Sequence, residues 1–253
     1  MLALTTPQLS NIRGTTVAMI FQEPMTALDP AYTVGRQIAE TVVRHAGCSY
    51  DDAYTRARDL LELVKVPSAA RRLAAYPHEL SGGLRQRAMI AMALSCRPSL
   101  LLADEPTTAL DATVQIQVLV LLRQLQAELG MGVIFVTHDL GVAAEIADTI
   151  AVMYAGRMVE TGSVQAVLQH PLHPYTAGML SSTIVGHRRG SRIEAIPGTP
   201  PPCGAYHQEA VSRHAVRTPS QPVLRRFLRH STSQQGVWPA ACVSTRMASA
   251  RLP

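Results

Sequence analysis

The stretch "LLLADEPTTALD", residues 100–111, decides the fold, because an apolar run there leads directly into two adjacent carboxylates. A short apolar run bounded by polar residues predicts a buried strand. Asp104 and Glu105 then stand at the carboxyl end of that strand. Paired acids in that place suit a metal ion and an activated water, although such a pair, taken alone, is equally typical of an ordinary surface cap.

Apolar strands alternate with amphipathic helices along most of the chain. Strands are predicted at 99–105 and 132–138, with a hairpin-like pair at 149–156 and 157–163. Helical periodicity is found at 33–46, 51–66, 84–96, 112–129 and 140–148. Continuous apolar strands separated by helices indicate an α/β fold with a parallel sheet. The helical stretch at 31–80 interrupts this alternation, so we interpret it as an inserted α-helical subdomain.

Composition and charge exclude several classes of protein. With 47% hydrophobic and 16% charged residues, the chain is globular in composition, and no apolar run approaches the ~20 residues that span a bilayer. The four cysteines are scattered without a CxxC pair, which favours a reduced compartment. Residues 204–253 hold seven arginines and one glutamate, a balance of +6; since the whole chain carries +5, the first 203 residues carry −1. We therefore expect no nucleic-acid binding by the body of the chain.

Four further motifs carry candidate chemistry. "ELSGGLRQR" (79–87) places Ser81, Gly82 and Gly83 before a helix, where backbone N–H groups form an anion site. "AMIFQEP" (18–24) puts Gln22 at a strand end, and "FVTHD" (135–139) does the same for His138. "TALD" (108–111) follows the acid pair directly. Each motif alone is more often an ordinary loop or strand end, so their order along the chain is the signal.

In this order the motifs resemble the ATP-binding cassette (ABC) ATPases, from about residue 12 to about residue 202. "FQEP" is similar to the Q-loop, "LSGGLRQR" to the signature, "LLLADE" to the Walker B strand, "TALD" to the D-loop and "VTHD" to the H-loop. Within this superfamily, "HPLHPYTAGMLSS" (170–182) followed by "IPGTPP" (196–201) resembles the ATPase subunits of dipeptide, oligopeptide and glutathione importers. The implied fold is a P-loop NTPase core with a helical subdomain and a C-terminal extension.

The resemblance implies a role for each residue that matches a family motif. Four residues would serve the chain's own nucleotide: Asp104 and Gln22 at Mg²⁺, Glu105 as general base, and His138 at the γ-phosphate. Gln22 would also contact the attacking water. Four others would act across a head-to-tail dimer, namely Ser81, Gly82 and Gly83 at the partner's γ-phosphate and Asp111 as the link between the two sites.

The same resemblance implies cofactors, partners and location. The cofactors would be ATP and Mg²⁺. The partners would be a second ABC ATPase subunit, in a homo- or heterodimer, two transmembrane permease subunits and, indirectly, an extracytoplasmic peptide-binding protein. The protein would lie peripherally on the cytoplasmic face of the inner membrane. The cargo itself, a dipeptide, longer peptide, glutathione or metal chelate, is left open.

One motif of the family is not found in these 253 residues: the P-loop, GxxxxGK followed by Ser or Thr. The single lysine, Lys65, lies in the helical part without a glycine-rich loop before it. We therefore expect an incomplete P-loop NTPase core. The expected divisions are a core remnant up to the Q-loop (1–30), the helical subdomain (31–80), the main ATPase core (81–162), the importer extension (163–202) and an atypical basic tail, disordered or read in a shifted frame (203–253).

Three hypotheses from different classes follow. In the first, the chain is part of a working importer ATPase whose gene start has been misplaced. In the second, it is a remnant without activity, truncated at both ends. In the third, it is a binding module that lends Ser81 and Asp111 to another subunit's P-loop without hydrolysing ATP at its own site.

Overall fold

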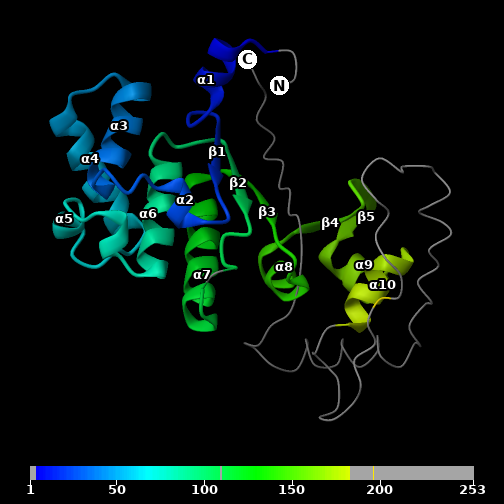
Figure 1. The fold of residues 1–253 in the computed structure, drawn as a ribbon. Helices are drawn as coiled ribbons and strands as arrows, with labels where there is room; N and C mark the ends of the chain where they lie inside the picture. Colours follow the sequence, from blue (N-terminus) through cyan, green and yellow to red (C-terminus); the bar gives the residue numbers. More distant parts are fainter. Residues whose placement is uncertain (1–3, 109, 183–195, 197–253) are drawn as a thin grey trace. The chain divides into compact units, whose positions relative to one another are not determined.

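The computed structural model describes residues 4–108, 110–182 and 196, and these fall into two compact units (Figure 1). The described part of the first unit ends at Val136, and the second begins at Thr137. The predicted basic tail at 203–253 lies outside the described residues, as does most of the importer extension beyond residue 182. No helix of the described part is long and apolar enough to cross a membrane.

The first unit is built on a parallel sheet, as the sequence predicts. The strands β1 (Val17–Ile20), β2 (Leu100–Asp104) and β3 (Gly132–Val136) lie in the order β1-β2-β3, so the acid-bearing strand is central. Ala103 is opposite Ile20 on one side and Phe135 on the other. Because parallel strands end at the same edge of a sheet, the loops after β1 and β2 meet there.

The two faces of this sheet differ in burial. The residues on one face are fully or almost fully buried: Ala18, Ile20, Leu101, Ala103, Val133 and Phe135. On the other face Met19 is 38% exposed and Val136 41% exposed, and Leu102 and Ile134 are partly buried. The buried face supplies most of the apolar contact that stabilises the sheet, since stabilisation scales with apolar area removed from water.

Among the described residues of the first unit, eight helical elements accompany the sheet. They are α1 (Thr6–Ile12), α2 (Pro24–Ala27), α3 (Val34–Ala46), α4 (Tyr50–Leu63), α5 (Ala69–Arg72), the 3₁₀ turn η1 (Pro77–Glu79), α6 (Gly82–Leu94) and α7 (Ala112–Leu129). α6 packs against β1 on one side and against α3 and α4 on the other. Figure 1 shows α3, α4 and α5 gathered on the side of α6 away from the sheet. α6 therefore connects the helical group to the sheet.

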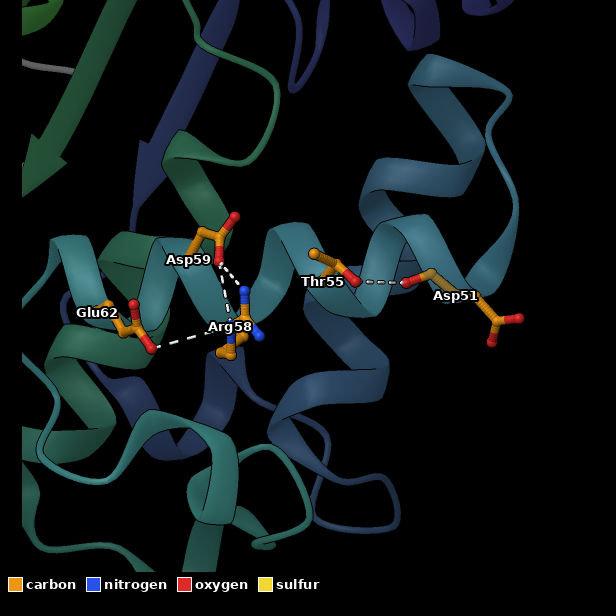
Figure 2. A network of polar contacts seen from close by, with 5 residues as sticks. All are labelled: Asp51, Thr55, Arg58, Asp59 and Glu62. Atoms are coloured by element: carbon orange, nitrogen blue, oxygen red, sulfur yellow. Dashed lines mark hydrogen bonds and ion pairs between the residues drawn. The ribbon is translucent and has the colours of Figure 1, made fainter.

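The α3–α4 pair follows ordinary helix rules. Thr33 and Ser49 cap the two helices, each accepting a backbone N–H of the first turn, and Gly47 ends α3 in the left-handed conformation with φ 65°. On the exposed side of α4, Arg58 contacts Asp59 at 2.8 Å and Glu62 at 3.9 Å, while the hydroxyl of Thr55 donates to the Asp51 carbonyl at 3.1 Å (Figure 2). Exposed contacts of this kind contribute little to stability.

The prediction that this second helix continues to residue 66 is wrong by three residues. α4 ends at Leu63, and Lys65 takes a left-handed backbone with φ 60°. The Lys65 N–H then donates to the Glu62 carbonyl, and the Val66 N–H to the Leu61 carbonyl, both at 2.9 Å. These bonds satisfy the last carbonyls of the helix. A left-handed helix end of this kind usually has a glycine, but here the residue is Lys65, so the sequence does not predict the end of the helix.

The second unit contains α8 (Leu140–Ile146), the antiparallel hairpin of β4 (Thr149–Tyr154) and β5 (Arg157–Ser163), α9 (Val164–Gln169) and α10 (Pro174–Ser181). The predicted hairpin is confirmed. Its core consists of buried residues from α8, β4, α9 and α10: Leu140, Ala143, Ile150, Val152, Val167, Leu168 and Leu180. The carboxylate of Glu160 accepts the N–H groups of Leu172 and His173, at 2.8 and 3.1 Å, and so holds the segment "HPLHPY" against β5.

Candidate functional site

The loops after β1 and β2 bring Gln22 and Glu105 together. Glu105 follows β2 directly, and Gln22 lies two residues after β1. The Gln22 side-chain Nε2 donates to Glu105 Oε2 at 3.0 Å, although 83 positions separate the two residues. The adjacent, parallel strands therefore produce a polar contact that joins two motifs distant in the sequence.

Glu105 has an unusual backbone. Its φ is 41°, in the left-handed region that residues with a Cβ seldom adopt. Its N–H donates to the Val136 carbonyl at 2.9 Å, and its carbonyl accepts the Thr108 N–H at 3.3 Å. A conformation of this kind costs about 1–3 kcal/mol and persists where surrounding bonds fix it, most often at functional sites.

A second side chain reaches the same carboxylate oxygen. The Thr108 hydroxyl donates to Glu105 Oε2 at 2.8 Å, so this oxygen accepts bonds from both Gln22 and Thr108. Thr108 begins the motif "TALD", but the motif predicts no role for it. Its only sequence signal is a hydroxyl three residues after the acid, inside the turn that the backbone bond closes.

The start of α6 packs against the start of α7. A Cβ added at Gly83 would lie 2.7 Å from Val114 Cγ1, closer than real Cβ contacts, so glycine permits this approach. Asp111 caps α7: its Oδ1 accepts the N–H groups of Thr113 and Val114, at 3.1 and 3.0 Å. Through Val114 the structure therefore brings the signature glycines and Asp111 into one neighbourhood. Ser81, at the N-cap of α6, and Gly82 are exposed.

A cavity of about 130 Å³ lies beside this neighbourhood. Its lining comes from three motifs: Gln22, Glu23, Pro24 and Met25 after β1, Gly82, Arg85 and Gln86 of α6, and Pro106 and Leu110 after β2. Gln86 is 1% exposed, and its Nε2 has no hydrogen-bond partner among the described residues. The Q-loop, signature and acid-pair motifs thus line one cavity.

Asp104 fits a role at a metal ion. It is the last residue of β2, is partly buried, and makes no side-chain hydrogen bond or ion pair within the described part of the chain. No group of three His, Cys, Asp or Glu side chains that could hold a metal occurs among the residues the structure describes. Mg²⁺ beside a nucleotide needs only one or two carboxylates, with phosphate oxygens and water as the other ligands. The donor set is therefore compatible with Mg²⁺ bound together with a nucleotide.

His138 belongs to the second unit. It lies between β3 and α8, is exposed, and precedes Asp139, whose Oδ1 accepts the Gly141 N–H at 3.0 Å. Asp139 thereby caps α8. An approach of His138 to the nucleotide site stays a prediction.

The chain belongs to the ATP-binding cassette (ABC) transporter ATPases, in the branch that carries the oligopeptide/dipeptide transporter C-terminal region. The ABC transporter family model matches residues 4–108, and the model of that C-terminal region matches residues 159–209. The family named on the sequence motifs is confirmed.

Its curated relatives include two kinds of import protein. The chain is 48% identical over 223 residues to the glutathione import ATP-binding protein GsiA of Salmonella typhimurium, covering 86% of this chain and 35% of the relative. It is 53% identical over 205 residues to a peptide import ATP-binding protein of Brucella melitensis, covering 79% of this chain and 61% of the relative. The chain therefore spans about a third to three fifths of the length of these relatives.

The fold is also similar to that of a solved cassette. The dimeric structure of the ATP-binding cassette MJ0796, in a post-hydrolysis state bound to ADP and Pi, matches with a TM-score of 0.57 and 30% identity. The match covers 64% of this chain and 68% of that one. The α/β fold class of an ABC ATPase, with its parallel sheet, is thereby confirmed.

Proposed function

We propose that this chain is the ATP-hydrolysing part of a subunit that powers an ABC importer of peptides. The observation that carries the proposal is the contact of Gln22 with Glu105 at 3.0 Å, since it joins two family motifs at the carboxyl end of the sheet. The peptide class of cargo is supported by the matching C-terminal region and by the names of the relatives. The partners proposed are a second ATPase subunit and two permease subunits, with the protein at the cytoplasmic face of the membrane.

The chain's own residues would divide the chemistry as follows. Glu105 accepts a proton from the water that attacks the γ-phosphate, and Gln22 orients that water. Asp104 holds Mg²⁺, which neutralises phosphate charge when it is bound with the nucleotide. His138 donates to the γ-phosphate. Ser81, Gly82 and Gly83 present donors to the nucleotide of the partner subunit, and Asp111 links the two sites.

Glu105→Gln tests the proposed role of Glu105 as general base. The protein is expressed from its complete gene, so that any segment adjoining these 253 residues is present, and ATP binding and hydrolysis are measured separately. Removal of a general base should lower the hydrolysis rate about 100-fold or more while ATP binding is kept. Glu62→Gln, on the exposed side of α4, is the matched control and should hydrolyse at the wild-type rate. Wild-type hydrolysis by Glu105→Gln would remove Glu105 from its role.

A second candidate function is a non-hydrolysing partner that completes another subunit's ATP site. It is favoured by the exposure of Ser81 and Gly82 at the start of α6. The test mixes the protein with the Brucella relative and measures the ATPase rate of the mixture. Under this function the protein alone is inactive, the mixture is faster than the relative alone, and Ser81→Arg abolishes the increase.

A further inference from the structure

Two donors converge on one oxygen of Glu105, and they differ in how they are attached. Gln22 reaches Oε2 from the loop after β1, across 83 positions of sequence. Thr108 reaches the same oxygen from three residues away, at 2.8 Å. Gln22 has a second task under the proposed function, since its amide would also orient the attacking water. Thr108 has no such task.

The turn from Glu105 to Thr108 is closed twice. The Thr108 N–H donates to the Glu105 carbonyl at 3.3 Å, and the Thr108 hydroxyl donates to the Glu105 carboxylate at 2.8 Å. Glu105, whose φ is 41°, is thereby fixed at both its backbone and its side chain. Hydrogen bonds to a charged carboxylate are stronger than neutral ones and direct the oxygen they bind. Because the bond joins residues only three apart, it does not depend on the loop after β1.

We propose that Thr108 is a positioning residue, whose hydroxyl keeps the Glu105 carboxylate in its orientation. The inference rests on the proposed function, since it assigns the orientation of the general base. In this role Thr108 takes no proton. It acts through Glu105 alone.

The test compares Thr108→Val, which keeps the shape and removes the hydroxyl, with Thr108→Ser, which restores the hydroxyl. Hydrolysis is measured on the protein expressed from its complete gene. Thr108→Val should lower kcat about tenfold with little change in KM for ATP, as expected from loss of one bond to a charged group. Thr108→Ser should return kcat to near the wild-type value. Equal kcat in Thr108→Val and wild type would overturn the proposal.

A second readout needs no hydrolysis. Gln22 Nε2 shares the carboxylate oxygen with Thr108, so its side-chain amide signals in an NMR spectrum report the orientation of Glu105. Thr108→Val should shift these signals and Thr108→Ser should restore them. Thr55→Val is the matched control, because it removes an exposed threonine hydroxyl bond on α4 instead. Unshifted Gln22 signals in Thr108→Val would also overturn the proposal.

Failure of the proposed function and failure of the proposed role of Thr108 give different results. If Glu105→Gln hydrolyses ATP at the wild-type rate, the proposed function fails, and the amide signals alone then decide whether Thr108 positions Glu105. If Glu105→Gln is inactive while Thr108→Val keeps the wild-type kcat, the proposed function stands and only the role of Thr108 fails.

Discussion

The α3–α4 pair and the turn from Glu105 to Asp111 use similar polar bonds to different ends. In the helical pair, threonine and serine caps and a left-handed glycine all agree with the local sequence. In the turn, a glutamate takes a left-handed backbone, and its side chain bonds to a residue 83 positions away. The starts of α3 and α4 therefore follow local rules, and Glu105 departs from them where distant motifs meet, although Lys65 at the end of α4 also takes a left-handed backbone.

One glycine in the helical pair and one in α6, which packs against the helix after the turn, allow close approaches. A Cβ at Gly35, in α3, would lie 2.7 Å from the Leu73 carbonyl oxygen; a Cβ at Gly83, in α6, would lie 2.7 Å from Val114 Cγ1. The obstacle is backbone in the first case and a side chain in the second. A side chain moves aside more readily than a carbonyl that already accepts the Gly35 N–H at 2.9 Å.

Gly35→Ala should give the largest loss of stability in this comparison. Overpacking against the Leu73 carbonyl costs about 3 kcal/mol, and the better helix propensity of alanine returns about 1 kcal/mol, so a net loss of about 2 kcal/mol is expected. Denaturant unfolding followed by circular dichroism measures it. The control is Gly82→Ala, whose Cβ would meet only Leu110 Cδ2 at 3.9 Å and should cost nothing. Equal stability of Gly35→Ala and Gly82→Ala would show that the Leu73 carbonyl does not hinder a Cβ at position 35.

The difference between the regions also explains what the sequence could predict. The helix at 112–129 was predicted at its observed bounds, because Asp111 caps its start and Gly130, with φ 63°, ends it. The end of α4 was missed, because Lys65 takes a left-handed backbone without any glycine signal. Periodicity and caps report local energetics, so the bounds of α7 follow from them directly and the end of α4 does not.

The site was predictable only in part. The meeting of Gln22 and Glu105 follows from parallel strands that end at one edge, once the order of the strands is known. The bond from Thr108 and the backbone of Glu105 do not follow from any pattern, since a threonine three residues after an acid is common in loops. They depend on how tightly the turn is closed by tertiary contacts, such as the bond from the Glu105 N–H to the Val136 carbonyl.

Asp111→Ala should have an intermediate effect, because it removes the cap of α7 at the edge of the turn. Loss of a cap that accepts two N–H groups costs about 1 kcal/mol. Asp111→Asn keeps an acceptor oxygen and should retain most of that stability. Thermal unfolding of both variants provides the measurement. If both variants lose the same amount, the negative charge rather than the cap stabilises the start of α7.

Arg58→Ala should have the smallest effect, although its contact with Asp59 in Figure 2, at 2.8 Å, is as short as that of Thr108 with Glu105. The hydrogen bond and charge of Asp59 raise the pKa of Arg58 above its usual value, yet both side chains are exposed, at 46% and 59%. Solvent and salt screen such pairs, so unfolding at low and high salt should give the wild-type stability in both conditions. A clear loss at low salt alone would show that the network on α4 does stabilise the helix.

The same physics applies at the turn, where Thr108 is also exposed. Thr108→Val should therefore unfold like Arg58→Ala, at nearly the wild-type free energy, and differ from it in kcat alone. Similar loss of stability in Thr108→Val and Asp111→Ala would instead make the bond to Glu105 part of the folding of the turn. Exposed polar bonds would then stabilise the fold both in the α3–α4 pair and in the turn from Glu105 to Asp111. The two regions would then differ only in the left-handed backbone of Glu105.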